Sequence, residues 1–339
     1  MAHSIAPGAG GRLLGDDDDA ADPHPGSPTE ADNVVIEVRG LTKRYGTTIA
    51  VDDLSFVVPD GKVTGFLGPN GAGKSTTMRI MVGLDEPSAG HVRIDGRSYG
   101  SRRFPLHQVG ALLEARSTHP GRTARNHLAW LAACNGIPAA RVDAVLDLVG
   151  LGSVAGRRLG GFSLGMGQRL GIASALLGDP ATLILDEPVN GLDPEGILWI
   201  RNLLRALAAE GRTVFVSSHL MSEMELTADH LIVIGRGQLI ADVSVAEFTE
   251  QARSDLVHVR SPQAERLRDL LVGATVHVTA TAPGRLEVIG LSSDQIGDVA
   301  AANMIPIHEL VPHQASLEQA FMKLTRDAVE YQPTERVAS

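Results

Sequence analysis

A glycine-rich segment constrains this 339-residue chain more than any other feature. Residues Gly68 to Ser75 read GPNGAGKS and match the pattern G-x-x-x-x-G-K-[ST]. The apolar run Val63–Leu67 precedes the segment, and a helix-compatible stretch follows from Lys74. Glycines let the backbone curl so that successive N–H groups point at phosphate oxygens, and a helix N-terminus adds partial positive charge. The pattern predicts a phosphate-binding loop between a strand and a helix of an α/β fold.

The loop also supplies two polar side chains. Lys74 is expected to reach the outer phosphates of a nucleotide, and Ser75 to offer an oxygen to Mg²⁺. An incidental glycine turn is the alternative, and the strand before it and helix after it disfavour that reading. The residues expected to contact the nucleotide are Gly68, Pro69, Asn70, Gly71, Ala72, Gly73, Lys74, Ser75 and Thr76.

Two carboxylates and a histidine follow later strands. The buried-type run Thr182–Leu185 ends in Asp186 and Glu187, and ionised groups there are costly unless they meet cations or donors. We predict that Asp186 holds Mg²⁺ and that Glu187 polarises an attacking water as general base. The alternative is a strand that ends in a solvated loop. His219 follows the next strand, at the edge where α/β sheets bind ligands, and is a candidate γ-phosphate contact.

The order of apolar runs predicts a parallel sheet with both faces covered. Leu54–Val58 and Lys62–Leu67, joined by the turn Pro59–Gly61, are expected to form a hairpin. Helix is expected from Thr76 to Gly83 and over much of 124–178, interrupted at Gly160–Gly167. The other expectations are strands at Val34–Val38, Thr182–Leu185, Val214–Ser217 and Leu231–Ile234, and a helix at Ile197–Ala209.

The pattern changes after Ala246, where short strands and helices alternate differently. The expected strands are Leu256–Val259, Val276–Thr279, Arg285–Ile289 and Ile307–Val311, and the expected helices are Gln263–Leu271, Ser293–Asn303 and Ser316–Thr325. The order β-α-β-β-α-β predicts a small α+β domain of the ferredoxin-like type over 246–330. Residues 331–339 are expected to be a tail.

Composition excludes several classes of protein. Residues 1–32 carry seven acidic side chains and one basic one, so they hold six of the ten net negative charges and predict a disordered acidic tail. The nearly neutral remainder and an aromatic content of 4% disfavour nucleic acid as a partner. Cys134 is the single cysteine, which excludes an intrachain disulfide and fits a reducing compartment. No apolar run reaches the roughly 18–20 residues that span a bilayer.

Together these motifs resemble the nucleotide-binding subunit of an ABC transporter, over roughly residues 34–245. The resemblance implies a P-loop NTPase core of the ABC ATPase type over 33–245, with a helical subdomain over about 116–178. Tyr45 in KRYG looks like the residue that stacks on adenine. His219 matches the family's switch histidine. Glu114 stands where the family usually has glutamine; it can still offer oxygen to Mg²⁺ but lacks the amide donor.

The resemblance also implies a site completed by a second copy of the chain. Residues 162–166 (FSLGM) occupy the place of the family's signature sequence, which faces ATP bound to the opposite subunit. Ser163 and Gly165 remain from that signature, whereas Leu164 and Met166 replace its first glycine and its glutamine. Ser163 is expected to cap the following helix, whose N-terminus would then face a γ-phosphate. Asp193 in NGLD looks like part of the loop that communicates between the two ATP sites.

The function implied is ATP binding and hydrolysis, with ATP and Mg²⁺, by a homodimer that energises a separate integral-membrane permease. The finer similarity is to ATPases of drug and antibiotic exporters of the daunorubicin and bacitracin types, including the tail Leu317–Phe321. The exported compound would be a drug, an antibiotic or a lipid-like molecule. Such a subunit is cytoplasmic and lies on the inner face of the membrane through its permease.

Two other functions are open to this sequence. A soluble ABC-type ATPase acting on ribosomes or DNA is one, although such relatives usually carry paired ATPase domains or long coiled arms. A serine hydrolase is the other, because Gly161–Gly165 fits G-x-S-x-G. That motif requires a buried strand directly before the serine, and the run Gly156–Gly161 does not have the pattern of a strand.

Overall fold

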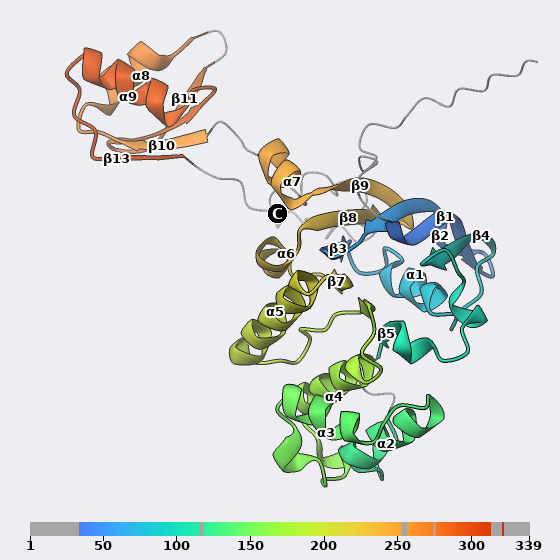
Figure 1. Cartoon of the computed structure of the whole chain (residues 1–339). Coiled ribbons are helices and arrows are strands. Elements are labelled where there is room, and N and C mark those ends of the chain that lie inside the picture. Colours follow the sequence, from blue (N-terminus) through green and yellow to red (C-terminus); the bar gives the residue numbers. More distant parts are fainter. Residues whose placement is uncertain (1–33, 115–117, 253–255, 274–275, 313–320, 322–339) are drawn as a thin grey trace, which may run out of the picture.

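The computed structural model describes residues 34–114, 118–252, 256–273, 276–312 and 321 (Figure 1). The predicted tails over 1–32 and 331–339 lie outside the described residues. The predicted helix Ser316–Thr325 also lies outside them, apart from Phe321.

A six-stranded sheet forms the centre of the larger unit. Its order is β5-β6-β7-β3-β8-β9, and all neighbouring strands are parallel except β9, which pairs antiparallel with β8. The strands are β3 (Val63–Leu67), β5 (Val109–Leu112), β6 (Thr182–Leu185), β7 (Thr213–Ser218), β8 (His230–Gly235) and β9 (Gln238–Ser244). The predicted parallel sheet is confirmed.

One face of this sheet is covered by helices. They are α4 (Leu164–Leu176), α5 (Pro194–Ala209), α6 (Met221–Thr227) and α7 (Val245–Ala252). The helices α2 (Ala124–Cys134) and α3 (Ala140–Leu148) pack against α4 and against each other (Figure 1). Short 3-10 turns lie in the connections at Tyr99–Ser101, Pro105–His107, Gly152–Val154 and Leu159–Gly161. Leu67, Leu185 and Val216 from the sheet share a buried apolar cluster with these helices. The helix α4 begins inside the glycine-rich run that was expected to interrupt helical structure, since Ser163 caps it.

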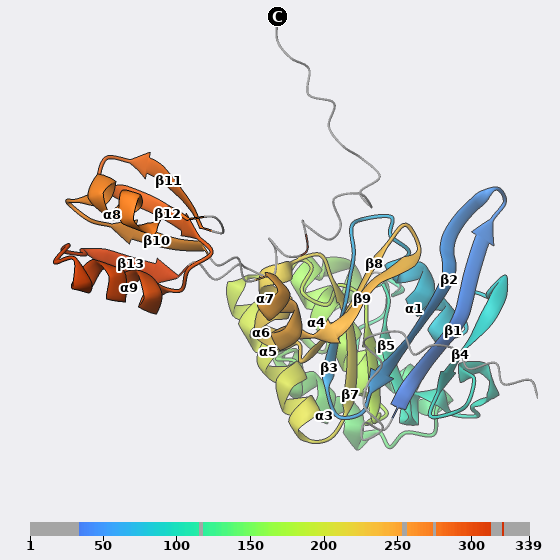
Figure 2. The same ribbon diagram turned by 90° about the horizontal axis from the view of Figure 1, so that it is seen from above.

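The other face is covered by a second sheet and one helix (Figure 2). The second sheet has the antiparallel order β2-β1-β4, from β1 (Val34–Tyr45), β2 (Thr48–Pro59) and β4 (Ala89–Ile94), and the helix is α1 (Lys74–Met81). Phe66 and Phe215 of the central sheet meet Phe56 of β2, with ring centroids 5.0 to 5.9 Å apart. Alternate residues of β3, β6, β7 and β8 pack into the two different cores.

The predicted hairpin between Leu54–Val58 and Lys62–Leu67 is wrong. β2 pairs with β1, whereas β3 lies between β7 and β8 in the other sheet. All five residues of β3 are buried, so both its edges need hydrogen-bonding partners inside the protein. β2 turns one face to solvent and belongs to an outer sheet. The turn at Pro59–Gly61 thus carries the chain from one layer to the next.

The C-terminal unit is a separate α+β structure. Its elements are β10 (Leu256–Arg260), α8 (Ala264–Leu271), β11 (His277–Ala282), β12 (Arg285–Ile289), α9 (Ser293–Ala302) and β13 (Glu309–Pro312). The antiparallel sheet has the order β11-β12-β10-β13 and shares its own apolar core with α8 and α9. This is the arrangement of the split βαβ fold that the order of elements predicted.

Candidate active site

The phosphate loop connects β3 to α1 at the carboxyl edge of the central sheet. Gly71 and Gly73 have φ of 83° and 103°, a region that side chains disfavour. A Cβ on Gly73 would lie 2.5 Å from the carbonyl oxygen of Ala50, and a Cβ on Gly68 would lie 2.5 Å from that of Ile234. The loop therefore needs glycine at these positions both for its curvature and for close packing against neighbouring strands.

Lys74 is the first residue of α1, and its side chain folds back over the loop. Its Nζ donates to the carbonyl oxygens of Gly68 at 2.6 Å and Pro69 at 3.2 Å. Burial lowers the pKa of Lys74, while the charges of Glu187 and Asp186 act to raise it. The ammonium is thus a partly desolvated cation held at the loop, near both carboxylates. Such a group is suited to binding phosphate.

The two acidic residues follow β6, as the sequence predicted, and one serine holds both. Ser217 of β7 is fully buried; its Oγ donates to Asp186 Oδ1 and accepts the N–H of Glu187 at 2.9 Å. The Asp186 N–H donates to the carbonyl of Leu112 in β5 at 2.7 Å. Neighbouring parallel strands thus fix the acidic pair. Sequence reasoning did not single out Ser217, because pairing of β6 with β7 decides this contact.

Glu187 and His219 meet in the structure. Glu187 Oε2 lies 2.7 Å from His219 Nδ1, although the residues are 32 positions apart. Glu187 has φ of 49°, an uncommon conformation for a residue with a side chain. Its carbonyl accepts the side-chain N–H of Gln168, from α4, at 3.1 Å. Gln168 lies beside the signature-like segment, and its sequence position gave no sign of this contact.

An open cavity of about 390 Å³ brings most of the predicted site together. This volume falls within the range of small-molecule sites. Its lining includes Asn70, Gly71, Ala72, Gly73, Lys74, Ser75, Thr76, Glu187 and His219, all predicted, together with Ala50 and Asn190, which were not. Amide groups, one ammonium and two hydroxyls therefore face a carboxylate and an imidazole across one space. The arrangement is suited to binding a polyphosphate and activating a water beside it.

Tyr45 and Glu114 lie close to the loop but outside this lining set. The Tyr45 hydroxyl donates to Asp85 at 2.9 Å, and Arg79 of α1 donates to the same carboxylate at 2.8 Å. Lys43 Nζ lies 4.9 Å from the centre of the Tyr45 ring. Glu114 follows β5, and its charge is among those that raise the pKa of Arg79, after that of Asp85. Their roles toward adenine and Mg²⁺ stay predictions.

The remaining predicted residues begin helices. Ser163 accepts the N–H of Met166 at 3.2 Å and caps α4, as predicted. Asp193 accepts the N–H of Gly196 at 2.9 Å and caps α5. A Cβ on Gly165 would lie 3.0 Å from the carbonyl oxygen of Gly191, so the two helix starts are close to each other. Within the described residues, none of these positions lines the cavity at the phosphate loop.

The serine hydrolase alternative is contradicted here. A 3-10 turn at Leu159–Gly161, and not a buried strand, precedes Ser163. The Ser163 side chain accepts the helix N–H of Met166 instead of standing on a strand-to-helix elbow.

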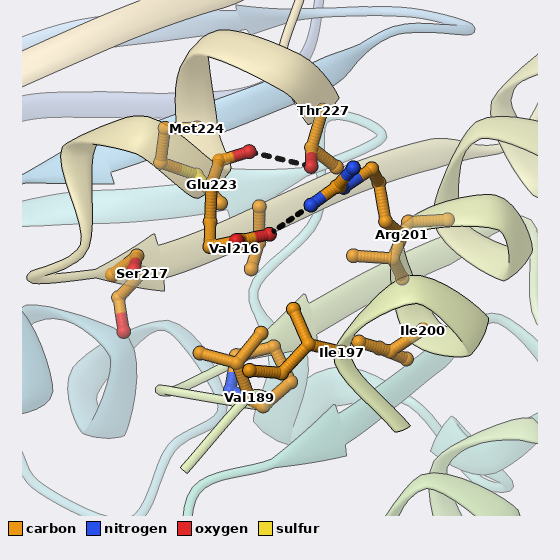
Figure 3. Close-up of a pocket in the computed structure, with 12 residues that line it drawn as sticks. Val189, Ile197, Ile200, Arg201, Val216, Ser217, Glu223, Met224 and Thr227 are labelled. Carbon is orange, nitrogen blue, oxygen red and sulfur yellow. Dashed lines mark hydrogen bonds and ion pairs between the residues drawn. The ribbon is translucent and has the colours of Figure 1, made fainter. Parts of the chain in front are cut away.

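A second, very small cavity lies behind the acidic pair, between β7, α5 and α6 (Figure 3). Its volume of about 10 Å³ is close to the minimum for one water molecule, so it is a packing defect and not a ligand site. Beside it, Arg201 of α5 pairs with Glu223 of α6 at 2.7 Å, with side chains 21% and 17% exposed. The pair anchors the helix that begins two residues after His219.

Comparison with known proteins agrees with this site. Residues 51–190 match the ABC transporter family, and residues 255–318 match a domain of unknown function. The bacitracin transport ATP-binding protein BcrA of Bacillus licheniformis is 36% identical over 298 residues, covering 86% of this chain and 97% of that protein. The lantibiotic transport ATP-binding protein SrtF of Streptococcus pyogenes is 37% identical over 208 residues, covering 61% of this chain and 90% of that protein.

Solved structures agree on the fold. A structure described as an ATP-binding subunit of an ABC transporter is 28% identical to this chain, with a TM-score of 0.59, and the match covers 64% of this chain and 92% of that one. The predicted α/β fold class is therefore confirmed. With a phosphate loop, an acidic pair and a histidine gathered at one sheet edge, and with these relatives, the chain belongs to the ABC transporter family, as an ATP-binding subunit that hydrolyses ATP.

Proposed function

We propose that this chain works in pairs on the inner face of the cell membrane and drives a separate permease that exports an antibiotic-like compound. The observation that carries the proposal is similarity to BcrA over 97% of that protein's length, which includes the C-terminal unit as well as the ATPase core. Among the described residues, no helix has both the length and the apolar character to cross a bilayer. The transport path would then belong to another polypeptide.

The residues at the loop fit an Mg²⁺–nucleotide complex. Ser75 and Asp186 would hold Mg²⁺, with Glu114 as a further oxygen donor; all three offer the hard oxygen ligands that this ion prefers. Bound Mg²⁺ would neutralise phosphate charge. The loop amides and the Lys74 ammonium would orient the phosphates, and glycine at position 73 lets the loop pack closely against Ala50.

Glu187 is the group we assign to proton transfer. Its carboxylate borders the cavity and lies 2.7 Å from the His219 imidazole, so it can accept a proton from a water held there. His219 orients that carboxylate and is 45% exposed toward the cavity side, where it can also donate to a γ-phosphate. Ser217 and Gln168 fix the backbone on each side of the carboxylate.

The position of the signature-like segment (residues 162–166) supports the proposed pairing of two copies. Ser163 and Leu164 are exposed at the start of α4, and neither lines the cavity of its own chain. A helix N-terminus attracts phosphate, so this one would complete the nucleotide site of a second copy. ATP would then hold two subunits together and hydrolysis would release them.

The catalytic assignment is tested with Glu187→Gln, which keeps the size of the side chain and removes its basicity. We expect ATP binding to persist while steady-state hydrolysis falls by about 10²–10⁴-fold. Size-exclusion chromatography with ATP should then show a longer-lived dimer. Unchanged turnover would remove Glu187 from this role, and Lys74→Ala, which should lose ATP binding, serves as the comparison.

The transport assignment needs the membrane partner. Extraction of the tagged full chain in mild detergent should recover an integral-membrane polypeptide. Cells that produce the Lys74→Ala variant in place of the wild type should become more sensitive to the exported antibiotic. Salt-sensitive recovery of ribosomes or DNA, with no membrane protein, would instead support the alternative of a soluble ABC-type ATPase.

A further inference from the structure

The peptide of Glu187 is held by side chains from two different elements. Ser217 of β7 accepts its N–H at 2.9 Å, and Gln168 of α4 donates to its carbonyl at 3.1 Å. Asn190 also donates its N–H to that carbonyl at 3.1 Å, closing a local turn. With φ of 49°, Glu187 is strained, and such a conformation persists only where the surroundings impose it.

Gln168 is the part of this arrangement that calls for an explanation. It is only 4% exposed, in a helix whose other buried residues are all apolar. Burying a glutamine is costly unless it is hydrogen-bonded, and ordering its side chain loses rotamer entropy. The bond to Glu187 compensates that cost across 19 residues of sequence.

The same helix touches the next loop. Leu164, in the first turn of α4, contacts Gly191, and a Cβ on Gly165 would lie 3.0 Å from the Gly191 carbonyl oxygen. The first turn of α4 therefore contacts one end of the segment 187–191, at Gly191, and Gln168, one turn later, contacts the other end, at Glu187. A displacement of α4 must change the position of the Glu187 peptide or break these contacts, because packed interiors deform little.

We propose that Gln168 is a positioning residue for Glu187, and that it makes the position of the Glu187 carboxylate depend on the position of α4 in the same chain. The inference rests on the proposed role of Glu187 as general base. Gln168 does not contact the nucleotide cavity; it acts on Glu187 through one main-chain carbonyl.

The test uses Gln168→Met in the full chain. Methionine has a similar size and shape but no N–H donor. The Glu187 carbonyl keeps the Asn190 N–H, so the fold retains a partner there. We expect kcat for ATP hydrolysis to fall at least tenfold while the Kd for ATP changes less than twofold. Leu170→Met, a buried and volume-conserving change in the same helix, is the matched control and should leave both constants unchanged.

A double-mutant cycle separates positioning from a general loss of structure. In a Glu187→Gln background, Gln168→Met should slow the residual hydrolysis less than twofold, because the group that it positions is already gone. A tenfold loss in both backgrounds would overturn the inference, as would normal kcat in a folded Gln168→Met. If that variant is insoluble, Gln168→Asn keeps the amide but is too short to reach the carbonyl, and the same outcomes apply.

The outcomes also distinguish this inference from the function on which it rests. Full activity of Glu187→Gln would refute the role of the carboxylate and the inference together. A slow Glu187→Gln combined with a normal Gln168→Met would refute the inference alone.

Discussion

Replacing Gly73 with alanine tests whether the phosphate loop is held by steric necessity. Gly73 has φ of 103°, and its added Cβ would lie 2.5 Å from the Ala50 carbonyl oxygen and 3.3 Å from Val51 Cγ2. An L-residue at positive φ costs about 1–2 kcal/mol, and overpacking of a tight contact costs about 1–3 kcal/mol. The lower conformational entropy of the unfolded alanine variant offsets about 0.4–1 kcal/mol of this cost. We expect a net destabilisation of about 1–5 kcal/mol.

Gly211→Ala is the matched control for this change. Gly211 has φ of 88°, similar to that of Gly73, but a Cβ there would meet no atom within 4 Å. Alanine at this position would have the unfavourable positive φ without the clash, so we expect about 0–1.6 kcal/mol of destabilisation. The difference between the two variants therefore isolates the contact with β2.

The assay is urea denaturation followed by tryptophan fluorescence, together with a titration of a fluorescent ATP analogue. Gly73→Ala should lower the unfolding midpoint clearly more than Gly211→Ala does, and should lose nucleotide binding because the loop must move away from Ala50. Equal midpoints for the two variants, or tight ATP binding by Gly73→Ala, would refute the reasoning.

Three further changes have defined outcomes. Ser163→Ala removes the cap of α4 and should lower the free energy of unfolding by about 1 kcal/mol, measured against Ser153→Ala, which caps no described helix. Arg201→Leu leaves Glu223 unpaired and should lower the free energy of unfolding by about 1–3 kcal/mol, whereas the double variant Arg201→Leu/Glu223→Leu should regain most of that stability. A second loss of stability that simply adds to the first would contradict the role of the ion pair. The hydrogen bond from Arg79 lowers the pKa of Asp85, so ionised Asp85 stabilises the fold above its unfolded pKa of about 3.9, and this stabilisation is lost as pH falls through the lower folded pKa. The wild type should therefore be more stable than Asp85→Asn at pH 7, and the two stabilities should converge in acid. A difference in stability that does not change with pH would refute the assignment.

The parts of the site that sequence predicted are those whose chemistry is local. The phosphate loop is a contiguous run whose glycines, lysine and serine act together, so its spacing alone indicated the strand, the loop and the helix. Asp186 and Glu187 were visible because carboxylates directly after an apolar strand require a cation or a donor. The order of elements likewise indicated the antiparallel C-terminal sheet.

Tertiary structure alone decided how distant segments meet. Lateral neighbours in a sheet are not encoded in the local pattern, so β3 was expected beside β2 but lies between β7 and β8. The same pairing of β6 with β7 brings Ser217 to both carboxylates, and the packing of α4 brings Gln168 to Glu187. Local sequence determines which groups a segment can offer; the burial of whole strands and helices determines which of those groups come within hydrogen-bond distance.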